Sequence, residues 1–228
     1  MKEIQAAYRK LVLQYHPDKN SSKKDDVQFK LIADAYHTLR NQHKVEAKSS
    51  KKFADLYPED AVSLYDQAEA LFASRKYDEA VAYYDKVTMQ LPRYTNAWLR
   101  KGDCLSNLKR HEEALVCYDK VLEIEPNSMS AWNLKGICLS DMKRYDEALE
   151  SFDKALVINP RHAAIWNLNG VCLYNLKRYD EALESFDKAT KFDPDFANAW
   201  YNKGNLLLKL ERKSEGTKCI EKAKKLRR

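Results

Sequence analysis

Few residues of this chain stand in patterns that could carry out covalent chemistry. Its 228 residues include five cysteines, with no C-x-x-C pair and no cluster of His and Cys at the spacing of metal ligands. There is also no nucleophile paired with a base and no glycine-rich phosphate loop. We therefore expect no enzymatic activity, no metal site and no cofactor. The absence of a disulfide pattern is typical of a reducing compartment, and we expect a cytoplasmic protein.

The remaining candidate is a short polar segment, His16-Pro17-Asp18-Lys19-Asn20, which separates two helical patterns. Apolar residues at helical spacing precede it at Ile4, Tyr8, Leu11 and Tyr15 and follow it at Phe29, Ile32, Tyr36 and Leu39. These patterns predict two antiparallel helices joined by the polar segment. A His-Pro-Asp tripeptide is weak evidence by itself, and its position between these helices makes it specific.

In this setting, the residues between 2 and 40 resemble the J-domain of the DnaJ family. The resemblance rests on residues 2–11 (KEIQAAYRKL), residues 15–20 (YHPDKN), and Phe29, Lys30, Ile32, Ala35, Tyr36 and Leu39. It implies a co-chaperone that stimulates the ATPase of a DnaK-type heat-shock chaperone. It further implies that His16, Pro17 and Asp18 are the trigger, with Asp18 engaging an arginine of the partner. The other implied contacts are Tyr8, Arg9 and Lys10 on a basic docking face and Lys19, Asn20, Phe29 and Lys30 beside the trigger.

Two features of this segment qualify the resemblance. Tyr8 and Phe29 can equally be core residues of the hairpin. A J-domain also begins with a further short helix, and Met1 lies just after the place where that helix would stand. We therefore expect residues 1–44 to form a J-domain that is truncated at its N-terminus, with a polar linker over residues 45–60.

The rest of the chain repeats with a period of 34 residues. Three residue types share the period, namely Trp98, Trp132, Trp166 and Trp200; Gly102, Gly136, Gly170 and Gly204; and Pro58, Pro92, Pro126, Pro160 and Pro194. The period divides the chain into units 61–94, 95–128, 129–162, 163–196 and 197–228. Each unit contains two apolar patterns of helical period around a polar turn, so each is predicted to be a helical hairpin.

These units resemble the tetratricopeptide repeat (TPR), whose landmarks are Trp, Gly, Ala and Pro at this period. Within a unit, Gly136 and Ala148 are small residues that let the two helices approach closely. Tyr84, Tyr118, Phe152, Phe186 and the cysteines are expected to be core residues. The predicted fold class is all-α: a J-domain-like helical hairpin followed by a right-handed TPR α-solenoid of five helix-turn-helix repeats, which has a concave groove.

The resemblance implies that the inner face of each first helix binds a client or partner protein. The residues at the inner positions are Leu99, Asp103, Asn133, Ile137, Asn167, Val171, Tyr201 and Asn205. Asparagines there can hydrogen-bond a peptide backbone, or they can simply be solvated. A Lys/Asn/Arg clamp for a carboxylate is not expected, because the first unit has Tyr65 and Glu69 at the equivalent positions.

Charge and hydropathy exclude other classes of partner. No run approaches the length of apolar sequence that a membrane span needs, so we expect no membrane partner. Lys and Arg exceed Asp and Glu at both ends of the chain but not over residues 61–208, where 19 face 22. Because this is no continuous basic stripe, we do not expect nucleic-acid binding, although the basic residues 209–228 leave it as a third hypothesis.

The leading hypothesis is a co-chaperone that recruits a client through its TPR groove. The alternative is a TPR scaffold for protein–protein interaction that carries a vestigial, inactive J-hairpin. The two hypotheses differ in whether the hairpin is complete enough to act.

Overall fold

The computed structural model describes residues 59–227. The predictions for residues 1–58, which include the J-hairpin and most of the linker, lie outside the described residues. The chain divides into two units after Val62, and the second unit, residues 63–228, contains the repeats.

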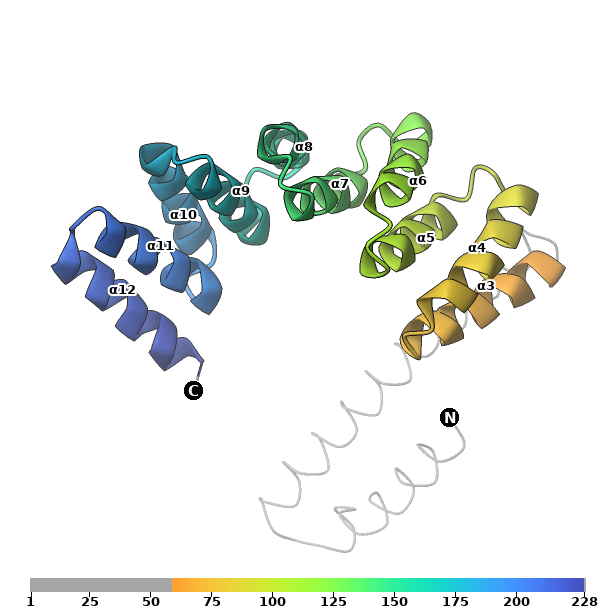
Figure 1. The fold of residues 1–228 in the computed structure, drawn as a ribbon, viewed down its shortest axis with the longest axis horizontal. Helices are drawn as coiled ribbons and strands as arrows, with labels where there is room; N and C mark the ends of the chain where they lie inside the picture. The colour runs from red at the N-terminus through yellow and green to blue at the C-terminus, as the bar shows by residue number, and fades with distance from the viewer. Residues whose placement is uncertain (1–58, 228) are drawn as a thin grey trace, which may run out of the picture. The chain divides into compact units, whose positions relative to one another are not determined.

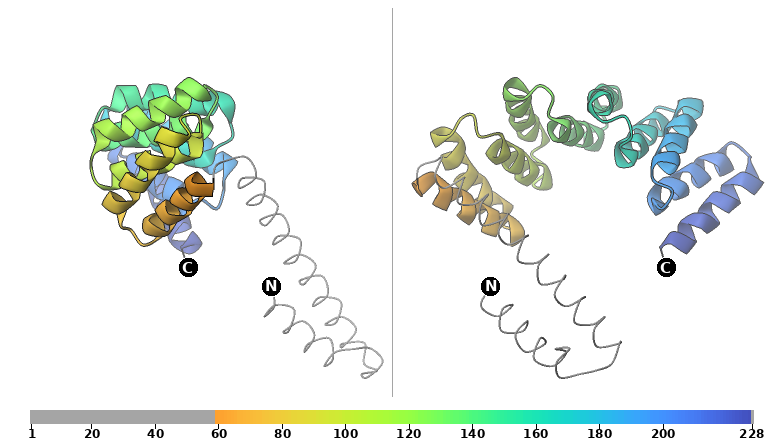
Figure 2. Two further views of the ribbon diagram at one scale, coloured as in Figure 1. Left: turned by 90° about the vertical axis from the view of Figure 1, so that its right-hand side faces the viewer. Right: turned by 180° about the vertical axis from the view of Figure 1, so that it is seen from behind.

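The described residues form ten helices and no strand. Successive helices pair as hairpins, and the hairpins follow one another in a curved row within this unit (Figures 1 and 2). The helices are α3 (Glu59–Ala73), α4 (Tyr77–Gln90), α5 (Thr95–Asn107), α6 (His111–Ile124), α7 (Met129–Asp141), α8 (Tyr145–Ile158), α9 (Ala163–Asn175), α10 (Tyr179–Phe192), α11 (Ala197–Lys209) and α12 (Lys213–Leu226). The predicted all-α solenoid is confirmed for this part of the chain.

The turn inside each hairpin is set by one residue in the left-handed conformation. In the third hairpin this residue is Lys143, with φ of 61°. The N–H of Arg144 then donates to the carbonyl of Leu139 at 2.9 Å, which satisfies one of the last acceptors of α7. The same conformation recurs at Arg75, Lys109, Lys177 and Glu211. The period therefore extends to the backbone angles, although none of these residues is a glycine.

An aromatic ring fills the space between the two helices of a hairpin. The predicted core rings Tyr84, Tyr118, Phe152 and Phe186 are at most 1% exposed. A Cβ atom placed on Gly136 would lie 2.6 Å from Cε1 of Phe152, so the glycine makes room for the ring. Ala148, which we expected to be the close neighbour of Gly136, is fully buried, but the ring supplies the nearest atoms. Backbone approach between glycines occurs instead in the last hairpin, where Gly204 faces Gly216.

The constant spacing of six residues between Pro and Trp in this chain has a direct physical cause. The indole Nε1–H of Trp132 donates a hydrogen bond of 2.9 Å to the carbonyl oxygen of Pro126. The same bond, at 2.8 to 3.0 Å, forms at Trp98, Trp166 and Trp200 with the proline six residues earlier. Each bond ties the loop that ends one repeat to the first helix of the next, and thereby fixes how successive repeats join.

Charged pairs also link successive repeats. Asp119 on α6 accepts from Nζ of Lys135 on α7 at 2.6 Å. Equivalent pairs join Asp85 to Lys101 at 2.5 Å and Asp187 to Lys203 at 2.7 Å. These lysines occupy the position where the repeat usually has an apolar residue, and the structure shows that they serve as partners for the aspartate of the preceding repeat.

The cysteines of the described residues are buried and form no disulfide. Burial raises the pKa of the Cys138 thiol to about 11, so this group stays protonated at neutral pH. In residues 59–227, no helix combines the length and the apolar character required to cross a membrane.

Candidate peptide-binding groove

The predicted chaperone contacts lie outside the described residues. They are His16, Pro17, Asp18, Tyr8, Arg9, Lys10, Lys19, Asn20, Phe29 and Lys30.

Two hollows lie along the predicted groove. The first hollow, of about 290 Å³, contains Leu99 and Asp103 and is bordered by Tyr65 and Leu134. The second, of about 300 Å³, contains Val171 and Asn205 and is bordered by Asn202. Four of the eight predicted groove residues thus line a hollow that a peptide side chain could enter.

Arg100 and Asp103, which line the first hollow, belong to a network of ionisable groups. Oε1 of Glu69 accepts a 2.6 Å hydrogen bond from the hydroxyl of Tyr84 and lies 3.2 Å from Nε of Arg100. Arg100 also lies 3.9 Å from Asp103, whose other oxygen accepts from the hydroxyl of Tyr118 at 3.3 Å. Two carboxylates therefore share one guanidinium, which leaves this end of the groove with one excess negative charge.

Burial raises the pKa values of Asp103 and Tyr84 in this network. It raises the pKa of Asp103 to about 6, although Arg100 and the Tyr118 hydroxyl oppose the shift. The pKa of Tyr84 is raised as well, by burial and by its hydrogen bond to Glu69. Asp103 is therefore a carboxylate near neutral pH whose charge is costly to maintain.

Replacing Asp103 by asparagine is expected to remove a pH dependence from the stability of the solenoid. Because the folded pKa of about 6 exceeds the ordinary aspartate value of 3.8, the native state binds more protons than the unfolded state between these pH values. Stability should therefore increase as pH falls from 7.5 to 5, by about 1 to 2 kcal/mol for this group. Urea unfolding at the two pH values measures the increase, which should be smaller in Asp103→Asn. An equal increase in both proteins would contradict the assignment.

The middle of the groove is uncharged and contains asparagines. Oδ1 of Asn133 is buried and has no hydrogen-bond partner within residues 59–227. Asn167, at the equivalent position of the next repeat, accepts from Nδ2 of Asn202 at 2.9 Å. A bound peptide backbone can donate to this oxygen only after the Asn133 side chain turns it toward the groove, because the atom is enclosed.

The remaining predicted residues lie beside these. Ile137 is partly buried on α7, and Tyr201 on α11 is 40% exposed, with the guanidinium of Arg227 5.1 Å from its ring. Arg100 and Asn202 also line the two hollows and were not among the predicted groove residues. Their repeat position is occupied by Leu134 and Leu168 in the third and fourth units, so the change from leucine to a polar residue was the available signal.

Comparison with protein families covers both parts of the chain. A model described as the DnaJ domain matches residues 1–47. TPR models match residues 170–211 and 197–228. A model of anaphase-promoting complex subunit 3 matches residues 73–155 and again 112–189. The two matches to this last model end 34 residues apart, which is one repeat. We infer that the model matches the repeated helical hairpin.

Curated relatives match the first part of the chain. The "DnaJ protein homolog 1" of Drosophila melanogaster is 45% identical over 60 residues, which are 26% of this chain and 16% of that protein. The "Chaperone protein DnaJ" of Chlorobium limicola is 56% identical over 43 residues, 18% of this chain and 11% of that protein. The chain therefore spans less than a fifth of the length of these relatives.

Solved structures match the solenoid. A MamA fragment from Desulfovibrio magneticus superposes with a TM-score of 0.69 at 20% identity, over 75% of this chain and 96% of that one. YrrB, which is described as a TPR protein with an unusual peptide-binding site, gives a TM-score of 0.61 at 24% identity, over 78% and 91%. At these identities the comparison establishes the shared fold.

Proposed function

We propose that this chain, which joins a match to the DnaJ domain with tetratricopeptide repeats, stimulates the ATPase of a DnaK-type chaperone while its solenoid holds a client protein. The observation that carries the proposal is the DnaJ-domain match over residues 1–47, which includes His16-Pro17-Asp18. In this proposal the chain has no catalytic activity of its own, and its reduced cysteines suit work in the cytoplasm.

The proposed division of labour follows from charge and shape. Arg9 and Lys10 give the hairpin a cationic face that is steered to an acidic surface of the chaperone, while Asp18 engages an arginine there. Such an encounter is fast, weak and sensitive to salt, as a catalytic cycle requires. The groove meanwhile has asparagines at its centre, and a turn of the Asn133 side chain would present its unpaired oxygen to an extended peptide.

Single-turnover ATP hydrolysis by a DnaK-type chaperone from the same source tests the proposal. The native chain should accelerate hydrolysis, His16→Gln should not, and His43→Gln, outside the motif, should behave as the native chain does. Acceleration that survives His16→Gln would refute the role of the motif. No acceleration by folded native chain would favour the scaffold with a vestigial hairpin.

Client binding is tested separately, by fluorescence anisotropy with a labelled unfolded protein. Val171→Glu places a charge in the second hollow and should weaken binding, whereas His16→Gln should leave binding unchanged. If Val171→Glu binds the client as the native chain does, the groove is not the client site.

A further inference from the structure

The interface between the third and fourth repeats lacks the ion pair that the other three described interfaces contain. At this position α9 has Asn169 where α5, α7 and α11 have lysine. Asp153 on α8 accepts from Nδ2 of Asn169 at 3.1 Å, and it forms no ion pair with any residue of the described chain. Oδ1 of Asn169 accepts in turn from the hydroxyl of Ser185 at 3.0 Å.

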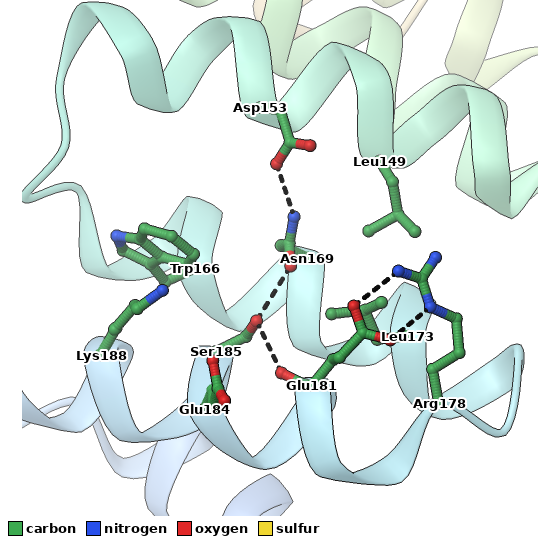
Figure 3. A pocket seen from close by; sticks show the side chains of 10 residues that line it. All are labelled: Leu149, Asp153, Trp166, Asn169, Leu173, Arg178, Glu181, Glu184, Ser185 and Lys188. Carbon is green, nitrogen blue, oxygen red and sulfur yellow. Dashed lines mark hydrogen bonds and ion pairs between the residues drawn. The ribbon is translucent and has the colours of Figure 1, made fainter.

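The shorter asparagine leaves a hollow of about 290 Å³ between α8, α9 and α10. Figure 3 shows Asp153, Asn169 and Ser185 in a row, with the indole of Trp166 on one side and Arg178 on the other. At the neighbouring interfaces the lysine ammonium lies close to both an aspartate and an indole.

At each interface that has the lysine, the ammonium contacts a tryptophan indole in addition to the aspartate. Nζ of Lys101, Lys135 and Lys203 lies 5.1, 5.6 and 5.2 Å from the centre of the tryptophan ring on its own helix. The equivalent ring, Trp166, is approached by Lys188 from α10 at 4.2 Å. Lys188 does not take the place of the missing lysine, because Trp200 is approached both by Lys203 and by Lys222, the equivalent of Lys188.

Charge around the hollow favours a cation. Arg178 is occupied by a bidentate pair with Glu181, at 2.7 and 2.6 Å. The other charged residues of the lining are Asp153, Glu184 and Lys188, so the lining carries one net negative charge. Burial raises the pKa of Asp153, and the hydrogen bond from Asn169 and the charge of Arg178 partly oppose this shift. An additional cation would offset the free-energy cost of keeping the buried carboxylate charged.

We propose that the hollow binds the primary ammonium group of a ligand, with Asp153 as its counterion and Trp166 as its aromatic wall. The ammonium then stands where a lysine of the chain stands at the other three interfaces. Two sources have this chemistry: the lysine side chain of a partner protein and a free polyamine. The site is separate from the groove, and it does not depend on the proposed function.

The four tryptophans make a test with internal controls. The full chain, labelled with 15N in its indoles, is titrated with Nα-acetyl-lysine amide, with spermidine, and with uncharged Nα-acetyl-norleucine amide at constant ionic strength. The two amines should shift the indole signal of Trp166 but not those of Trp98, Trp132 and Trp200, and the norleucine compound should shift none. Tighter binding of the lysine compound would identify a protein lysine as the ligand, and tighter binding of spermidine would identify a polyamine.

Two variants test the assigned groups. Asp153→Asn should weaken binding about tenfold or more, because a charge-assisted hydrogen bond is lost. Asn169→Lys should abolish binding by supplying the ammonium from the chain itself. Asp119→Asn, the matched change at an interface that has its lysine, should leave binding at Trp166 unchanged, and circular dichroism checks that each variant is folded. Absence of a shift at Trp166, or binding that persists in Asn169→Lys, would overturn the proposal.

Discussion

Gly136→Ala is expected to lower the free energy of unfolding by about 1 to 3 kcal/mol, because the added methyl group must displace the ring of Phe152. A Cβ atom at this position would lie 2.6 Å from Cε1 and 2.8 Å from Cδ1 of the ring, which is fully buried. Alanine in place of glycine inside a helix would otherwise stabilise by up to about 1 kcal/mol. The sign of the change, measured by urea unfolding, therefore shows directly whether the ring blocks the site.

The identity of the obstructing atoms predicts which glycines can be rescued. Adding Phe152→Leu to Gly136→Ala should recover part of the loss, because the obstruction is a side chain that can be made smaller. Gly204 is the matched control. A Cβ there would lie 2.7 Å from Cγ1 of Ile220 and 3.0 Å from the carbonyl oxygen of Gly216. Valine keeps a Cγ1 atom and the backbone oxygen cannot be removed, so Ile220→Val should give Gly204→Ala little relief. Equal rescue at both sites would contradict this account.

The solenoid was predictable because a repeat presents the same evidence several times. One Trp, Gly or Pro at a given position says little, but four tryptophans at a spacing of 34 residues fix the period and the hairpin boundaries. The fully buried rings of Phe152 and Phe186 follow from the same register. Apolar periodicity thus determines which residues form the core.

Contacts between repeats were less predictable, because their partners are distant in sequence or include backbone atoms. The indole bond to a proline carbonyl explains the spacing of Trp and Pro, but the residue types do not reveal it. The lysines at 101, 135 and 203 stand where the repeat usually has an apolar residue, and their aspartate partners belong to the preceding repeat. Asn169 becomes informative only when those pairs are known.

For the groove, too, the sequence predicted the positions of residues but not their chemical properties. The inner positions were predicted from the register, and Leu99, Asp103, Val171 and Asn205 line the two hollows. The raised pKa of Asp103 depends on its burial and on the groups around it, which the sequence pattern does not give. The 34-residue period therefore identifies which residues line the groove, whereas the chemistry of each residue depends on how it is packed.

Reversing the charge of the docking face, with Arg9→Glu and Lys10→Glu, is expected to raise the concentration needed for half-maximal ATPase stimulation more than tenfold at low salt. The reason is that two attractive charges become repulsive toward an acidic partner, and like-charge contacts at an interface cost several kcal/mol. Because the Debye length shortens from about 30 Å at 0.01 M salt to about 10 Å at 0.1 M, the native chain should weaken as salt rises. The charge-reversed variant should instead stimulate the ATPase weakly at every salt concentration.

The matched control is Lys23→Glu with Lys24→Glu, which changes net charge by the same amount in the polar stretch after the His-Pro-Asp motif. If the docking face is specific, this control should retain most of the stimulation and its salt dependence. Equal weakening by both pairs would mean that overall charge attracts the chaperone and that Arg9 and Lys10 have no special role. If neither pair weakened a measurable stimulation, the hairpin would act without an electrostatic docking face, and its contacts would have to come from other residues.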